Sequence, residues 1–311
     1  MDQAFCRTEP RGWIGLSEMS AMDRSISPLL VISWWSNCLA LDCLDHLVVH
    51  TTHRPVYVLQ VGKSPEQKAR FRASLPGRVV ELEYPENLPA EHSRVIQYAA
   101  FHLLGEESGL WLVDHDVFYQ AGLDDWLEAA DHTHKEVETL LCLPRREKGN
   151  PANTSPMFWL APRGWPAELY CIDPVPFHAR DESRRPDLFR SRLELVMPQK
   201  DTLMQAKEAL EARGRVCFYP VGNQSARTGS TPEKDMHLAG LPEHSHLGGL
   251  SLFTNQIPAE LYRQVDWFRQ WMRQTVEKFV QFYAACPPAR LALEDPILIQ
   301  RVGEYQEFVY G

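Results

Sequence analysis

Residues 28–33 read PLLVIS, an apolar run of the length and composition of a buried strand. Residues 36–50 carry apolar side chains at roughly helical spacing, and residues 56–62, VYVLQVG, form a second apolar run. Residues 64–75 then predict a helix that begins after Ser64 as its N-cap. Strand, helix, strand and helix in short succession predict a parallel sheet whose faces are covered by helices.

The alternation extends along the chain with less regularity. The further segments are strands at 78–84, 110–113, 137–143, 157–160 and 216–221, and helices at 91–104, 201–213 and 259–285. The residues between the strands at 137–143 and 157–160 are polar and predict a loop. We therefore expect an α/β fold with a mixed central sheet, in which ligands bind at the carboxyl ends of the strands.

Composition narrows the function classes. The 311 residues are 44% hydrophobic with a net charge of −9, which supports a folded core and disfavours a surface that follows a nucleic-acid backbone. The seven cysteines show no CxxC spacing, so neither a disulfide framework nor a structural zinc site is indicated. No secretory signal and no apolar run of about 18 residues is visible, and a cytoplasmic protein is expected.

The triplet Asp114-His115-Asp116 directly follows the apolar strand at 110–113. Residues i and i+2 of an extended chain point to the same side, so both carboxylates can converge on one point. Two such oxygen ligands suit Mg²⁺ or Mn²⁺, which complete their coordination with phosphates and water. The alternative is a simple turn at the strand end, because Asp favours turns.

Several common motifs are absent from the sequence. Neither GxGxxG nor GxxxxGK[ST] occurs, so the chain lacks the two usual glycine loops that hold phosphates. HExxH and GxSxG are also missing, which disfavours a zinc protease and an α/β-hydrolase. A phosphate-bearing ligand would therefore depend on a metal ion and basic side chains.

Three segments together resemble the GT-A glycosyltransferases. EHSRVIQYAAFHLLGEESGLWLVDHDVFY (91–119) resembles their central block, in which an Arg-bearing helix precedes a strand ending in a metal-binding DxD. KDTLMQAKEALEARGRVCFYPV (200–221) is similar to their acidic motif, helix and strand, and the segment ending HLGGLS (246–251) resembles their late His block. One departure is that Lys200-Asp201 stands where inverting members carry Glu-Asp.

The resemblance implies a GT-A-like catalytic domain at 28–256, between an N-terminal extension at 1–27 and a C-terminal helical extension at 257–311 packed on it. Its implied site consists of residues bordering the nucleotide (Ser33, Asn37, Gly62), residues facing the base or diphosphate (Arg94, Gln97), ligands of Mn²⁺ or Mg²⁺ (Asp114, Asp116, His246) and a general base (Asp201). His237 and His244 are alternatives to His246. Asp201 could instead be only the N-cap of its helix, and Arg94 only a solvated residue.

The activity that the resemblance implies is metal-dependent transfer of a sugar, in the hexosyltransferase class, from a nucleotide-diphosphate sugar to an acceptor hydroxyl. Asp201 in the place of a base favours inversion. The partners implied are the donor and an acceptor, without nucleic acid; peripheral membrane contact is not favoured by the negative net charge. The alternatives are a nucleotidyltransferase of similar architecture and a catalytically silent nucleotide-binding protein.

Overall fold

The structure is a computed structural model. The residues that it describes are 26–88, 90, 92–99, 110–119, 121–134, 140–142, 145–147, 150–153, 157–160, 216–218, 227–228, 244–247, 249–254 and 266–311.

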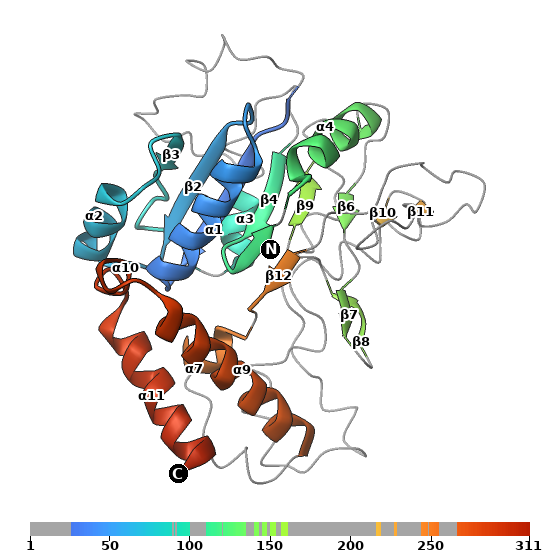
Figure 1. The fold of residues 1–311 in the computed structure, drawn as a ribbon. Coiled ribbons are helices and arrows are strands. Elements are labelled where there is room, and N and C mark those ends of the chain that lie inside the picture. The colour runs from blue at the N-terminus through green and yellow to red at the C-terminus, as the bar shows by residue number, and fades with distance from the viewer. Residues whose placement is uncertain are drawn as a thin grey trace.

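A central sheet of eight strands organises the described part of the chain, in the order β11-β10-β6-β9-β4-β1-β2-β3 (Figure 1). Its strands are β1 (Leu29–Trp34), β2 (Val56–Val61), β3 (Val79–Leu82), β4 (Leu110–Asp114), β6 (Leu140–Cys142), β9 (Met157–Leu160), β10 (Val216–Phe218) and β11 (Arg227–Thr228). The pairs β1–β2, β1–β4 and β2–β3 are parallel, whereas β9 is antiparallel to both β4 and β6. The expected mixed α/β sheet is confirmed.

Two short pairs of strands accompany the main sheet. β5 (Val117–Tyr119) pairs with β12 (His244–His246), and β7 (Arg145–Glu147) pairs with β8 (Asn150–Asn153), both antiparallel. The β7–β8 pair lies where the sequence predicts only a polar loop. Strands of three and four residues are too short to show a period in the sequence.

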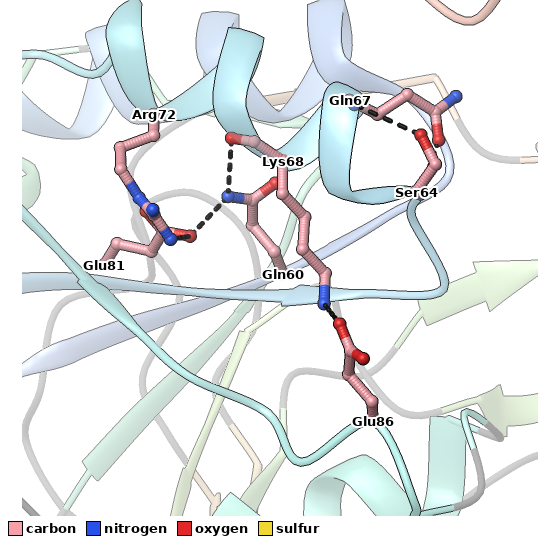
Figure 2. Close-up of polar contacts among 7 residues, drawn as sticks. All are labelled: Gln60, Ser64, Gln67, Lys68, Arg72, Glu81 and Glu86. Atoms are coloured by element: carbon pink, nitrogen blue, oxygen red, sulfur yellow. Dashed lines mark hydrogen bonds and ion pairs between the residues drawn. The ribbon is translucent and has the colours of Figure 1, made fainter.

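The described helices in the first half of the chain pack on the central sheet. Three of those in the second half lie near the C-terminus. They are α1 (Asn37–His50), α2 (Pro65–Ala73), α3 (His92–Tyr98), α4 (Leu123–His134), α7 (Ser251–Thr254), α9 (Asp266–Ala285), α10 (Pro288–Leu291) and α11 (Pro296–Tyr310). Ser64 is the N-cap of α2 as expected, in a capping box with Gln67 (Figure 2). β5 and α4 were not among the elements expected from the sequence, and residues 201–213 lie outside the described part.

The main hydrophobic core lies between the central strands and the helices α1, α2 and α4. Leu29 and Val31 of β1 pack there with Leu44 of α1 and Phe71 of α2, and all four are fully buried. Leu30 points to the opposite face of the sheet from Leu29 and Val31, and it is buried as well. Both faces of β1 are therefore covered. A strand buried on both faces accounts for the uninterrupted apolar run in the sequence.

A second core joins the C-terminal helices to the first helix of the fold. Cys38 and Leu39 of α1 pack with side chains of α7, α9 and α11. Figure 1 shows α9 and α11 side by side, with α10 next to the N-terminal end of α1. The apolar face expected for the long helix is confirmed over its described residues, where Met272, Val276, Phe279 and Tyr283 are buried. The expected C-terminal helices are therefore present.

Among the described residues, none of the helices combines the length and apolar character needed to cross a membrane.

Candidate functional site

The candidate site is located by the point at which the strand order of the sheet reverses. The chain runs outward from β1 to β2 and β3, then returns to the other side of β1 to form β4. In open α/β sheets, ligands bind beyond the carboxyl ends of the two strands on either side of such a reversal. Here those ends are Trp34 and Asp114, and the register pairs Ile32 with Asp114. The predicted acidic triplet therefore lies at the reversal.

The structure places the late His segment beside the acidic triplet. Asp114 is the last residue of β4, and Asp116 is 7% exposed. The backbone N–H of Leu247 donates to the carbonyl oxygen of Asp116 at 3.1 Å, and His246 lies opposite Val117 in the β12–β5 pair. His244 lies further away along the strand, opposite Tyr119, and His237 lies outside the described residues. Of the two candidate histidines whose backbone the structure describes, His246 is thus the nearer to Asp116 in register, while its side chain is not described.

The acidic triplet makes its surroundings electrostatically negative. Burial raises the pKa of the Cys43 thiol, and the nearby Asp116 and Asp114 carboxylates raise it further. Burial also raises the pKa of Tyr119, to which Cys43 and Asp114 contribute. Over the described residues, no group of three or more His, Cys, Asp or Glu side chains is gathered as a metal site. The two carboxylates nevertheless provide the hard oxygen ligands of Mg²⁺ or Mn²⁺, and a cation there would offset this negative charge.

The turn after β1 has an uncommon backbone conformation. Trp35 has φ = 62°, which is costly for a bulky residue other than glycine, and the N–H of Ser36 donates to the carbonyl oxygen of Trp34 at 2.8 Å. The indole Nε1 of Trp35 is buried without a hydrogen-bond partner within the described structure. Strain of this kind, at the end of a strand beside Asp114, is typical of functional turns.

Gly62, at the end of β2, lies against this turn. Its φ is +67°, and a Cβ atom built on it would be 3.2 Å from Nε1 of Trp34 and 3.3 Å from Cδ1. Glycine adopts this conformation at no steric cost, and its missing side chain leaves room for the indole. The structure thus gives Gly62 a definite role in shaping the strand ends, whereas its contact with a nucleotide stays a prediction.

Gly62→Ala is expected to destabilise the protein by about 1–2 kcal/mol, because a left-handed backbone is strained for alanine and the Trp34 ring must move. Gly77→Ala is the matched control, since nothing lies within 4 Å of its added Cβ. Urea unfolding of both variants measures the difference. Equal stabilities of the two variants would show that the Trp34 contact imposes no constraint.

Ser33 and Asn37 are brought together with a residue that the sequence did not single out, Lys63. Nζ of Lys63 donates to Oγ of Ser33 and, at 2.7 Å, to Oδ1 of Asn37. All three residues are nearly inaccessible, with exposed fractions of 0%, 1% and 8% for Ser33, Asn37 and Lys63. The Nδ2 amide of Asn37 donates to the carbonyl oxygen of Leu293 at 2.8 Å. The two predicted residues therefore belong to a buried polar network at the ends of β1 and β2.

Glu294, between α10 and α11, closes the N-terminus of α1. Its carboxylate accepts hydrogen bonds from the backbone N–H groups of Asn37 at 2.8 Å and Cys38 at 3.3 Å, and from the Ser36 hydroxyl. The Tyr283 hydroxyl also donates to it, at 3.1 Å. A carboxylate is favoured here by the exposed N–H groups and the positive end of the helix dipole. The C-terminal segment thus supplies the anion at the place where many α/β proteins bind phosphate.

The remaining predicted residues are placed only in part. Arg94 lies on α3 and is partly buried, and Gln97 is on the same helix, although its side chain is not described. Asp201 lies outside the described residues. The predicted role of each stays a prediction.

The outer edge of the sheet carries an ordered polar cluster of α2, β2 and β3 (Figure 2). The buried Gln60 donates through Nε2 to Oε1 of Glu81 at 2.6 Å, and Arg72 donates to the same carboxylate. Lys68 pairs with Glu86 at 3.3 Å, just beyond β3. These contacts join α2 to β2 and β3. They thereby support the carboxyl end of β2, shortly before Lys63.

No protein-family model matches this sequence, and no curated protein matches it. Solved structures do align with it in part. The glycosyltransferase GlyE of Streptococcus pneumoniae aligns over 57% of this chain with 11% identity and a TM-score of 0.35. The galactosyltransferase LgtC, in complex with donor and acceptor sugar analogues, aligns over 62% of this chain and 73% of its own, with 14% identity and a TM-score of 0.36.

A third partial alignment covers more of this chain. The mannosyltransferase PcManGT of Pyrobaculum calidifontis, in complex with GDP-Man and Mn²⁺, aligns over 96% of this chain and 78% of its own, with 12% identity and a TM-score of 0.39. The chain spans 36% and 45% of the length of the two GlyE structures. Likenesses at these TM-scores do not assign the chain to a family or an activity.

Proposed function

We propose that the protein transfers a sugar from a nucleotide-diphosphate sugar to an acceptor hydroxyl. The observation that carries this proposal is the arrangement at the reversal of strand order. Asp114 ends β4, Asp116 follows in the turn to β5, and the backbone of His246 pairs with Val117 directly after it. An acidic pair at this position, without a phosphate-binding glycine loop, suits a ligand whose phosphates are neutralised by a divalent cation.

In this proposal Asp114, Asp116 and His246 hold Mn²⁺ or Mg²⁺. When bound, the cation stabilises the negative charge that develops on the departing nucleoside diphosphate. Asp116 is well suited to this role because its side chain is 7% exposed and its carbonyl oxygen is fixed by the N–H of Leu247. Two carboxylates this close together repel one another, and a cation between them would relieve that repulsion.

The roles of the other residues follow from their places in the chain. Gly62 and the Trp34–Trp35 turn shape the carboxyl ends of β1 and β2, where the nucleotide would bind. Arg94 and Gln97, one turn apart on α3, would face the base or the diphosphate. Asp201 would take the proton from the acceptor hydroxyl as the general base, which gives inversion at the sugar carbon.

Thermal unfolding with nucleotide sugars tests the proposal. The protein is heated with UDP-galactose, UDP-glucose or GDP-mannose, with and without Mn²⁺. A ligand that binds only the folded state stabilises it by about 2.7 kcal/mol at 100 times its Kd, and the shift should require the cation. Released nucleoside diphosphate is then measured with the donor that binds. Binding of none of these donors in the presence of Mn²⁺ would contradict the proposal for these donors, and cation-independent binding would contradict the metal site.

A further inference from the structure

Lys63 is a buried cation held by neutral groups. It is 8% exposed, and its Nζ donates to the Ser33 hydroxyl and the Asn37 amide oxygen. The ammonium group also lies over the Phe71 ring, 4.3 Å from its centroid. Within the described residues, no carboxylate oxygen lies at salt-bridge distance from Nζ. A lysine has three N–H donors, so these two hydrogen bonds leave one donor for a further acceptor.

The obvious anion-binding position next to Lys63 is already filled. The N-terminus of α1 would ordinarily be available to a phosphate, but the Glu294 carboxylate occupies its N–H groups. Glu294 binds Asn37 through the backbone, while Lys63 binds the side chain of the same residue. A diphosphate at this end of the sheet therefore cannot use the helix N-terminus. Lys63 is the buried positive group that the described strand ends offer instead.

The position of Lys63 matches the proposed donor site. It follows Gly62 at the carboxyl end of β2, and β1 separates this end from Asp114 at the end of β4. Asp114 is in register with Ile32 and hence with Leu59, three residues before Gly62. Neighbouring strands are about 5 Å apart, so the two ends lie about 10 Å apart across the sheet and about 10 Å apart along it, within the length of a nucleotide-diphosphate sugar. We infer that Lys63 is a further donor-binding residue, whose ammonium group binds the diphosphate opposite the metal ligands. This inference rests on the proposed function.

The burial of Lys63 changes its pKa, and this change predicts a measurable uptake of protons on ligand binding. Desolvation lowers the pKa of Lys63 to about 7, although Glu294 on the C-terminal segment, Glu81 on β3 and Cys38 on α1 oppose the shift. Free Lys63 is therefore largely neutral at pH 8. A bound diphosphate stabilises the ammonium form and raises its pKa, so binding must be accompanied by proton uptake. The sugar diphosphate has no group of its own that titrates near this pH.

Calorimetric titration of the full chain with the nucleotide sugar that binds it, among UDP-galactose, UDP-glucose and GDP-mannose, measures this proton. The titrations are made with Mg²⁺ at pH 8 in HEPES and in Tris, whose ionisation enthalpies differ. We expect uptake of close to one proton per ligand, and an affinity that falls by up to about tenfold per pH unit above pH 7. Lys63→Met should lose both the proton uptake and the pH dependence. Lys68→Met, on the neighbouring helix, is the matched control and should retain them.

The outcomes separate the two proposals. If no nucleotide sugar binds the wild type at pH 7, the proposed function and this inference both fail. If a donor binds without proton uptake and with a constant affinity from pH 7 to 8.5, the function stands and the role of Lys63 is overturned, whatever the variants do. Uptake that persists in Lys63→Met overturns it too. If Lys63→Met does not fold, Lys63→Arg, whose charge does not titrate, should abolish the uptake.

Discussion

Asp116→Asn should lower the rate of sugar transfer by about 10³-fold or more at saturating Mn²⁺. The amide keeps the shape of the side chain but removes the negative charge that holds the cation, and such a cation contributes several kcal/mol to the transition state. Release of nucleoside diphosphate from the donor measures the rate. Removal of the metal from the wild type by EDTA should have an effect of similar size, and added Mn²⁺ should reverse it.

The control for this prediction is Asp125→Asn. Asp125 is an exposed carboxylate at the start of α4, only nine residues further along the chain, and should tolerate the change without loss of rate. Both variants should unfold at temperatures close to that of the wild type. An Asp116→Asn variant that remains fully active, or a wild type that is active in EDTA, would remove the cation from the mechanism.

Asp131→Ala should lower the free energy of unfolding by about 3–5 kcal/mol. Asp131 is 6% exposed and pairs at 2.6 Å with Arg54, itself 3% exposed. Its carboxylate also accepts from the indole N–H of Trp111 at 3.0 Å and from the backbone N–H of Ser27 at 3.1 Å. Removal of the acid leaves a buried guanidinium without its counter-charge, which is more costly than the loss of the pair as such.

Urea unfolding measures this effect, with Glu128→Ala as the exposed control on the same helix. The double variant Arg54→Met, Asp131→Leu should be more stable than Asp131→Ala, because neither partner then remains as an uncompensated charge. A double variant no more stable than the single one would mean that the hydrogen bonds to Trp111 and Ser27, not the ion pair, carry the contribution of Asp131.

The local parts of the fold could be predicted from the sequence because their signals are contained in short segments. The apolar run at 28–33 predicts a strand and corresponds to β1, and Ser64 is the N-cap of α2 as predicted. Burial of the aromatic face of α9 follows from the 3.6-residue period of its apolar side chains. Asp114 was placed at a strand end for the same reason, as it directly follows four apolar residues.

The parts of the fold and of the candidate site that could not be predicted from the sequence depend on contacts between residues far apart in the chain. Lys63 looks like an ordinary charged residue after a strand, and only the pairing of β1 with β2 brings it onto Ser33 and Asn37. Glu294 gives no sign in the sequence that its partner is Asn37, 257 residues earlier. The β12–β5 pair is too short to show a period of its own, so the pairing of His246 with Val117 could not be predicted, and only the order of motifs suggested His246 as a metal ligand.

The contact between Glu294 and the start of α1 has a consequence for how the chain folds during synthesis. The N–H groups of Asn37 and Cys38 obtain their buried partner only when residue 294 has been made, 257 residues after Asn37. Domains generally fold from the N-terminal side as they are synthesised, but here the unit of β1 and α1 depends on a carboxylate that is made much later. Long-range closure of this kind is intrinsically slow. The nascent protein should therefore expose Cys38, Leu39 and their apolar neighbours until α9 and α11, which cover them in the folded protein, have been made.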